Sequence, residues 1–249
     1  MRQTTDALII RENNNIGEAD RFVTALTREL GVVRASARGA RNIKSRNASA
    51  TQLLSYSRLG LYKGRDKYII DEAEPLRLFF GIREDIEKLA LAQYFCELSG
   101  VLAPQEEPAE DFLRLMLNAL HLLSENQRPP RQLKAVTELR MLALAGFMPD
   151  LTACAACGRF EGGPMWLQPR EGVLLCAPCG GGAPPGSRSL TEGTLAAMRH
   201  ILYAPFEKCF SFSMTEEGLR LLSGVVEDFL LTQLGRSFKT LDFYRSMEN

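Results

Sequence analysis

The sequence predicts a multidomain α+β protein in which a small β-barrel is followed by an α-helical domain with one inserted module. Three observations lead to this prediction. Short apolar runs at near-even spacing fill the first 75 residues, apolar residues recur at helical spacing after Pro75, and a stretch rich in Gly, Pro and Cys interrupts the helical pattern once. The composition, 45% hydrophobic and 24% charged over 249 residues, is typical of a globular chain and excludes a collagen-like, mucin-like or largely disordered protein.

Five short strands are expected in the first domain. Their apolar runs cover residues 7–10, 21–26, 32–38, 53–62 and 68–70, and Gly- and Asn-rich turns separate them. The longest gap, from Gly39 to Thr51, lies between the third and fourth strands. A five-stranded barrel of the OB type has this strand count, with a helix or long loop in that gap, although a small sandwich has the same count.

Five helices are expected in the rest of the chain. They cover residues 83–100, a segment that opens at Pro108 and stops at Pro129-Pro130, and residues 132–145, 191–203 and 215–234. We therefore expect a barrel domain at 1–78, a helical domain at 79–149 and 188–249, and a module at 150–187. Acidic pairs such as Glu227-Asp228 are expected on solvated helix faces.

The inserted module contains two cysteine pairs, Cys154/Cys157 and Cys176/Cys179, with eighteen residues between them. This spacing matches a four-cysteine zinc template, in which each pair of thiolates on a tight turn reaches one ion about 2.3 Å away. The runs 165–167 and 172–175 are typical of a hairpin, so the module is predicted to be a zinc ribbon. Four thiolates leave no position for water, which predicts one structural Zn²⁺ rather than a catalytic one.

The cysteines have other possible roles. Buried free thiols, a redox pair and disulfides are the alternatives, and a reducing compartment argues against disulfides. Cys96 and Cys209 lie in apolar helical contexts and are expected to be core residues.

Positive charge is concentrated in one segment. The whole chain has 30 basic and 30 acidic residues, but residues 34–67 contain nine basic residues and one acid, a net charge of +8. Surfaces normally mix both signs, so this segment predicts a local site for a polyanion. The candidate DNA-binding residues are Arg34, Arg38, Arg41, Lys44, Arg46, Tyr56, Arg58, Tyr62, Lys63, Arg65 and Lys67.

These candidates divide into two roles. Arg38, Arg41, Lys44 and Arg46 fall on one loop and are expected to hold phosphates. Tyr56, Arg58 and Tyr62 share one parity on the fourth strand, so the rings are expected to project outward, where Tyr56 or Tyr62 could stack on bases. The alternative is that the rings are core residues and the cations only solvate a loop.

No motif of an enzyme is present: the sequence has no Walker loop, no GxSxG and no metal-binding carboxylate pattern, and its two histidines lie inside helical patterns. We therefore expect a protein that is not an enzyme. We also expect a cytoplasmic protein without a membrane partner, since the sequence shows neither a targeting segment nor an apolar run of about 18 residues.

The order of several short motifs resembles the RecO family of bacterial DNA repair and recombination proteins. Each motif is weak alone, but together they cover nearly the whole chain. They are Leu8-Ile9-Ile10-Arg11, Gly17-Glu18-Ala19-Asp20, Gly39-Ala40-Arg41 with Lys44-Ser45, Leu53-Leu54, Ala73-Glu74, Leu139-Arg140, Gly146-Phe147-Met148-Pro149, the four cysteines, and Phe238-Lys239-Thr240-Leu241-Asp242-Phe243.

The resemblance implies an N-terminal OB fold, a helical domain and a zinc module. It further implies binding of single- and double-stranded DNA, annealing of complementary strands, work with RecR, contact with the C-terminal tail of the single-strand binding protein and, indirectly, loading of RecA. Such a protein would be associated with the nucleoid. The second hypothesis is a zinc-ribbon adaptor subunit of a transcription or RNA-processing complex, in which the basic loop is incidental or contacts RNA.

Overall fold

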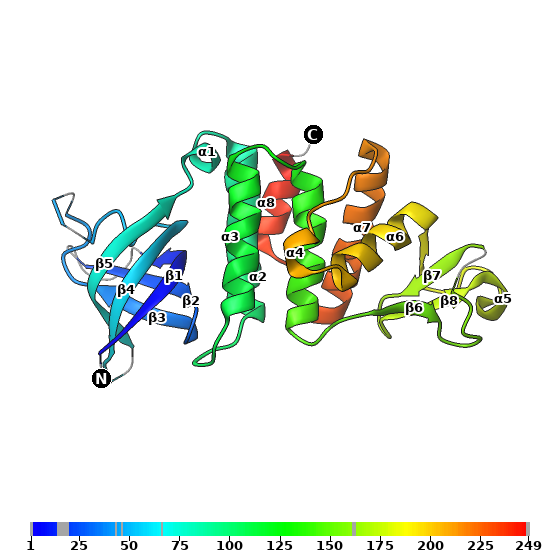
Figure 1. Cartoon of the computed structure of the whole chain (residues 1–249), viewed down its shortest axis with the longest axis horizontal. Helices are drawn as coiled ribbons and strands as arrows, with labels where there is room; N and C mark the ends of the chain where they lie inside the picture. The colour runs from blue at the N-terminus through cyan, green and yellow to red at the C-terminus, as the bar shows by residue number, and fades with distance from the viewer. Residues whose placement is uncertain are drawn as a thin grey trace. The chain divides into compact units, whose positions relative to one another are not determined.

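The structure, a computed structural model, describes residues 2–13, 20–42, 44–45, 47–65, 67–160 and 163–247, apart from the side chain of Asn13. The chain splits into two compact units, and Figure 1 traces it through both. The first unit comprises Met1–Gln127 and Phe238–Asn249, and the second is the intervening Arg128–Ser237. The three-part division expected from the sequence groups elements by type rather than by contact, and it stays a prediction.

The N-terminal strands form the closed barrel that the sequence predicts. The strands are β1 (Arg2–Asn13), β2 (Arg21–Thr27), β3 (Gly31–Ala37), β4 (Ser55–Lys63) and β5 (Tyr68–Leu78). Their order around the barrel is β1-β2-β3-β5-β4, in which β3 and β5 are parallel and β1 and β4 close the ring as an antiparallel pair. The sandwich alternative is therefore wrong.

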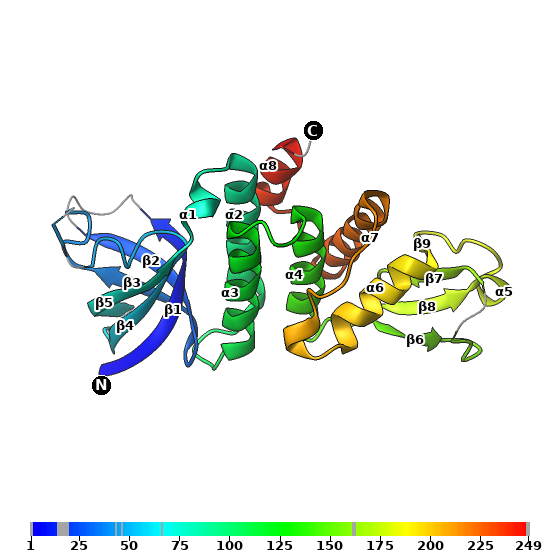
Figure 2. The same cartoon turned by 45° about the horizontal axis from the view of Figure 1, so that its top comes forward.

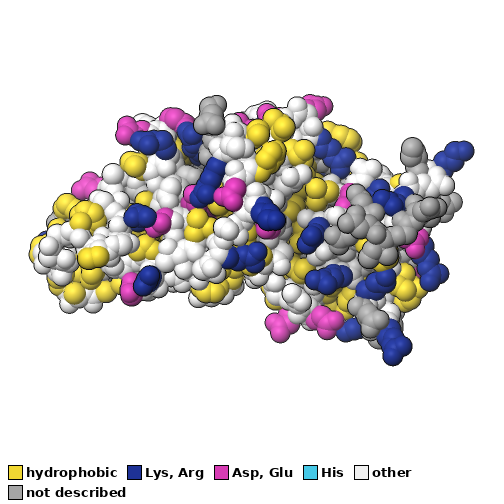
Figure 3. All heavy atoms as spheres, turned by 180° about the vertical axis from the view of Figure 1, so that it is seen from behind, with side chains coloured by type: hydrophobic (Ala, Val, Ile, Leu, Met, Phe, Trp, Pro, Cys, Tyr) yellow, Lys and Arg dark blue, Asp and Glu magenta, His cyan; other side chains and the backbone are white. Residues whose placement is uncertain are grey.

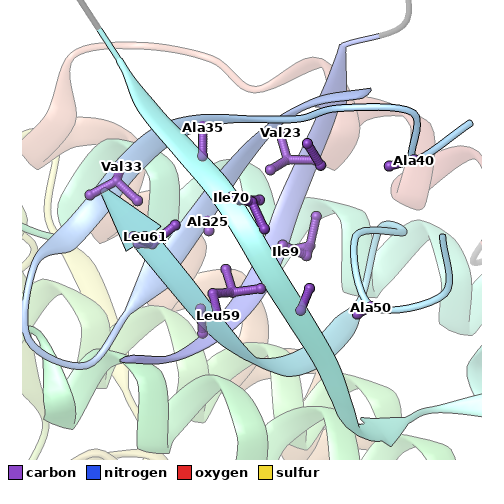
Figure 4. Packing of buried hydrophobic residues seen from close by; sticks show 13 residues of the cluster. Ile9, Val23, Ala25, Val33, Ala35, Ala40, Ala50, Leu59, Leu61 and Ile70 are labelled. Carbon is purple, nitrogen blue, oxygen red and sulfur yellow. The ribbon is translucent and has the colours of Figure 1, made fainter. Parts of the chain in front are cut away.

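Small side chains fill the barrel interior (Figure 4). Alternate residues of β2 and β3, such as Val23, Ala25, Val33 and Ala35, point inward, where a closed ring of five strands leaves little volume. The segment between β3 and β4 contributes Ala40 and Ala50 to the same cluster; its described residues form turns, not a helix.

Two strands are longer than their apolar runs. The start of β1 is polar, yet Arg2 pairs with Tyr62 of β4, so the strand begins well before the predicted Ala7. Likewise β5 continues to Leu78 instead of ending at Ile70, because its exposed residues still pair with β4. A paired strand that faces solvent lacks the apolar signal that the prediction relied on.

The first unit also contains four helices, α1 (Phe80–Arg83), α2 (Ile86–Leu102), α3 (Glu110–Ser124) and α8 (Lys239–Met247), arranged as in Figure 2. The helix α2 begins after Asp85, whose carboxylate accepts hydrogen bonds from the N–H groups of Glu87 and Lys88. The sequence did not predict α8. Glu97 of α2 accepts a 2.5 Å hydrogen bond from the Thr240 hydroxyl, and Tyr94 packs edge-on against Phe238.

Within this unit, α2 and α3 pack against β1 and β2 of the barrel. The link between the helices pairs with the β2–β3 turn, since the N–H of Val32 donates to Pro104 O at 2.8 Å and that of Ala109 to Arg28 O at 2.9 Å. Gly31 has a φ of +60°, and a Cβ there would lie 2.1 Å from the Pro104 oxygen. Only glycine fits this close approach.

The second unit combines helices with a four-stranded sheet. Its helices are α4 (Pro130–Leu144), α5 (Ala177–Gly180), α6 (Glu192–Tyr203), η1 (Phe206–Lys208) and α7 (Glu216–Leu234). Its strands are β6 (Asp150–Cys154), β7 (Met165–Gln168), β8 (Val173–Cys176) and β9 (Arg188–Leu190), in the order β6-β8-β7-β9. The predicted hairpin is confirmed as β7–β8. The strands β6 and β9 were not predicted, because they are too short to show an alternation of apolar and polar residues.

The helical core of the second unit contains buried charges. Lys134 of α4 has 1% of its side chain exposed, and its Nζ lies 2.9 Å from a Glu138 oxygen and 2.7 Å from a Glu227 oxygen. The expectation that Glu227 faces solvent is therefore wrong. Its spacing on α7 places it toward α4, where the lysine compensates its charge.

Candidate metal centre and nucleic-acid interface

The four cysteines converge at one end of the small sheet. Cys154 ends β6, Cys157 follows in a turn, Cys176 ends β8 and Cys179 lies in α5. Their four sulfur atoms all lie within 4.8 Å of one another, and the Cys157 and Cys176 sulfurs are 3.6 Å apart. Zinc–sulfur bonds of about 2.3 Å give a tetrahedron with edges of about 3.8 Å, so a small contraction would close this cage around one ion. The donor set can bind a metal ion.

Backbone geometry favours the thiolate form of Cys154. The N–H of Cys176 donates to its sulfur at 3.3 Å, and this bond, together with those from Cys157 and Ala156, lowers the pKa of Cys154 to about 6. Gly158, with a φ of +72°, closes the first turn by donating to Cys154 O at 2.8 Å. Metal ions bind the thiolate, so this turn holds one ligand ready.

The thiol form of Cys179 is favoured by its neighbours. Hydrogen bonds with Cys157 and Cys176 raise the pKa of Cys179 to about 12, since crowded sulfurs disfavour a second negative charge. All six cysteines are free of disulfides. Cys96 and Cys209 are buried, as expected of core residues, and burial raises the pKa of Cys96 to about 12, which keeps it a thiol.

The candidate DNA-binding cations lie in two environments on the barrel. Arg34 projects outward from β3, and Arg38, Lys44, Arg65 and Lys67 lie in the exposed turns that follow β3 and β4. None of these five has a carboxylate within ion-pair distance among the residues that the structure describes. Figure 3 shows Lys and Arg side chains gathering on the barrel, at the right of the view. Arg41 lies on the same loop, and Arg46 falls outside the described residues.

Two of the predicted cations are already paired. Arg58 donates to Asp6 at 2.9 Å, and Lys63 donates to Glu106 at 2.9 Å. Both pairs are exposed, so each contributes little to stability, but each neutralises charge that a phosphate would otherwise meet. These two residues are therefore weaker candidates for phosphate binding than the five unpaired cations.

The two predicted stacking tyrosines are not equivalent. Tyr56, Arg58 and Tyr62 project to the outer side of β4, as the alternation predicts, while Ser57 and Leu59 are buried. Tyr62 is 37% exposed. The Tyr56 ring is half-buried, its hydroxyl lies 3.5 Å from Asp6, and burial, followed by the Asp6 charge, raises its pKa. Only Tyr62 offers an open ring.

The structure adds Phe22, Ile69 and Arg11, which sequence reasoning missed. Phe22, Ser36, Ile69 and Tyr62 are register partners across β2, β3, β5 and β4, so they form one row on the outside of the barrel. The Lys67 ammonium lies 4.0 Å from the centre of the Phe22 ring. The next row carries Arg11, Thr24 and Arg34.

We call this surface the ring platform: Phe22, Ile69 and Tyr62 flanked by Arg11, Arg34 and Lys67. It lies over the strands and the β4–β5 loop with which OB folds hold oligonucleotides. The signal for Phe22 was present, because it has the parity opposite to the core residues Val23 and Ala25. It went unnoticed since an apolar ring beside a core run is read as core.

No helix among the residues described in the structure is both long and apolar enough to span a bilayer.

Two family models match the chain. The model described as Recombination protein O N terminal matches residues 1–79, and that described as Recombination protein O C terminal matches residues 83–242. The DNA repair protein RecO of Acetivibrio thermocellus is 32% identical over 98% of this chain and 96% of its own length, and that of Symbiobacterium thermophilum is 33% identical over 98% and 97%. This chain therefore belongs to the RecO family of DNA repair proteins.

Proposed function

We propose that the chain is a non-enzymatic DNA-binding protein of recombinational repair. It binds single- and double-stranded DNA and anneals complementary strands. With RecR, and through the C-terminal tail of the single-strand binding protein, it helps to load RecA. The observation that carries the DNA-binding part is the ring platform, where unpaired cations flank the exposed Tyr62 ring and the half-buried Phe22 ring on one face of the barrel.

The proposed chemistry separates charge from stacking. Arg34, Arg38 and Lys67 screen phosphates, which carry no sequence information, so binding is independent of sequence. Tyr62 and Phe22 present ring faces, on which an unstacked base gains about 1–3 kcal/mol. Duplex bases are already stacked, so duplex DNA would use the cations alone. Annealing follows when screened backbones of two strands can approach each other.

The four-cysteine centre completes the proposal as a structural site for one Zn²⁺. The bound ion would cross-link the two cysteine turns and supply no reactive position, because four thiolates fill its coordination. The four thiolate ligands would come from Cys154, Cys157, Cys176 and Cys179, whose sulfur atoms the fold already brings within 4.8 Å of one another.

The test compares two sets of charge-removing variants on the same barrel. Arg34→Gln/Arg38→Gln/Lys67→Gln removes unpaired cations, and the matched control Arg58→Gln/Lys63→Gln removes cations that Asp6 and Glu106 already neutralise. Fluorescence anisotropy with a labelled oligonucleotide should give a larger loss of affinity for the first set, on single strands and duplex alike. Annealing rates should fall in the same order.

Ring variants test the second component. Phe22→Leu and Tyr62→Leu should weaken single-strand binding and leave duplex binding nearly unchanged. Competition by RNA of equal length distinguishes the adaptor hypothesis, under which RNA would compete at least as well as DNA. A folded triple cation variant that binds and anneals normally would place the DNA site off the barrel.

A further inference from the structure

The strand that carries the first cysteine pair is weakly held by its own sheet. β6 is an edge strand, and its pairing with β8 has only two register positions, Asp150 with Val173 and Cys154 with Leu174, with an irregularity between them. The strands of this sheet are only three to five residues long, so each makes few backbone hydrogen bonds. Something outside the sheet must therefore fix β6 if Cys154 and Cys157 are to face the other two cysteines.

Side chains of α6 replace the missing neighbour strand. Arg199 donates from Nε to Leu151 O at 2.7 Å and from Nη2 to Thr152 O at 3.0 Å, and the Tyr203 hydroxyl accepts the N–H of Leu151 at 3.3 Å. These contacts satisfy the unpaired edge of β6, as a neighbouring strand would do.

The same guanidinium also reaches the far side of the cysteine turn. Its Nη2 lies 3.3 Å from Phe160 O, and its carbon lies 4.1 Å from the centre of the Phe160 ring. Because Cys154 donates to Arg159 O at 2.9 Å, the backbone on both flanks of the turn is drawn together at its base. Arg199 bridges the two flanks of the turn that holds Cys154 and Cys157.

We propose that Arg199 is the positioning residue of the metal centre. It fixes the backbone on both sides of Cys154 and Cys157 and so holds this half of the ligand set in place against Cys176 and Cys179. The inference rests on the proposed zinc centre. Arginine is required because its planar group donates in two directions and stacks on a ring at once, which a lysine ammonium does not do.

The test measures how fast the full-length protein loses zinc. Wild type, Arg199→Met and the matched control Arg170→Met are loaded with Zn²⁺, and release to excess chelator is followed by a colorimetric indicator. Arg170 lies on the same module, is exposed, and its side chain makes no hydrogen bond, ion pair or ring contact with the described residues. Partners that orient ligands typically contribute about 10- to 100-fold to metal affinity. We expect release from Arg199→Met to be about tenfold faster or more, and release from Arg170→Met to match wild type.

Two readouts distinguish positioning from general support of the fold. Absorption bands of Co²⁺ bound in place of zinc report the geometry of the four thiolates, and they should change in Arg199→Met alone. The unfolding rate, followed by Trp166 fluorescence, should change less than the release rate. Release that rises only in proportion to unfolding, with an unchanged Co²⁺ spectrum, would overturn the proposal.

Milder variants keep the test decisive if Arg199→Met does not fold. Phe160→Leu removes the ring that stacks on the guanidinium, and Arg199→Lys removes the planar group that donates in two directions. The rate of zinc release should therefore increase from wild type to Phe160→Leu and further to Arg199→Lys. Wild-type release from both would overturn the positioning role while leaving the zinc centre intact. A wild-type protein that binds no zinc would instead refute the metal centre itself, and the positioning role with it.

Discussion

Replacing Lys134 with methionine should strongly destabilise the second unit. Methionine has an unbranched side chain of nearly the same length and a similar helix propensity, so the variant removes little besides the charge. The ammonium faces two carboxylates at 2.9 and 2.7 Å, and Glu138 has no exposed surface. Without Lys134, Glu138 must either stay charged without its partner or take up a proton.

The magnitude follows from this burial. At an effective dielectric constant of about 20, each contact contributes about 6 kcal/mol of Coulomb energy, against several kcal/mol for removing each ion from water. Breaking a buried pair on one side typically lowers the free energy of unfolding by about 3–5 kcal/mol. This is a large part of the roughly 5–15 kcal/mol that stabilises a typical domain.

The assay is urea unfolding followed by tryptophan fluorescence. The chain has a single tryptophan, Trp166, which lies in the second unit, so the signal reports that unit. The control is Arg220→Met on α7, which removes an exposed partner of Glu217 at 3.7 Å and should change the free energy of unfolding by less than about 1 kcal/mol. A loss below about 1 kcal/mol for Lys134→Met would refute the reasoning.

The pH dependence adds a second check. Burial lowers the pKa of Lys134, but the charges of Glu138 and Glu227 outweigh it, and the net effect raises the pKa above its ordinary value. A raised lysine pKa stabilises the fold below the unfolded pKa, and this contribution is lost as pH rises through the folded value. The contribution of the lysine charge to wild-type stability should therefore stay constant from neutral pH to about 10 and be lost only above it, which urea unfolding of the wild type at each pH measures.

Three further predictions concern the metal, the DNA and the barrel. Purified protein should contain about one zinc per chain, and replacing Cys176 and Cys179 with serine should lower the melting temperature more than the DNA affinity; metal analysis well below one zinc would contradict the assignment. If about five phosphates are contacted, the logarithm of the single-strand association constant should fall with log salt at a slope of about −3.5, so a flat salt titration would exclude the cationic surface. Gly31→Ala should lower the free energy of unfolding of the first unit by about 2 kcal/mol or more. The control Gly39→Ala should lower it less, because Gly39 has a similar φ of +62° but nothing within 4 Å of a Cβ placed there. Equal losses of stability in the two variants would mean that the contact with Pro104 is unimportant.

The parts of the fold that the sequence predicted are those with strong local signals. Two cysteine pairs at a fixed spacing are hard to explain without a shared ion, and apolar runs separated by turn residues marked all five barrel strands. The long gap predicted between the third and fourth strands separates β3 from β4. Each of these signals lies within one continuous stretch of the chain, so tertiary contacts are not needed to recognise it.

The parts that escaped prediction depend on distant partners. Glu227 looks like a solvated acid until Lys134 is placed beside it, and Arg58 looks like a free cation until Asp6 is placed opposite. Phe22 looks like a core residue until β3 and β5 show which side of the sheet faces outward. In each case charge or hydrophobicity alone does not tell which side a residue faces.

The return of α8 to the first unit has a consequence for synthesis on the ribosome. Tyr94 and the rest of the α2 face are covered by Phe238, Leu241 and Tyr244, which are translated only after the 110 residues of the second unit. At about 5–20 residues per second, this apolar face stays open for roughly 5–20 seconds while the inserted unit emerges and can already fold. A nascent chain of this kind exposes a binding surface for chaperones until its last helix is released. A ribosome that stalls before residue 238 would leave the second unit complete but the first unit without its last helix.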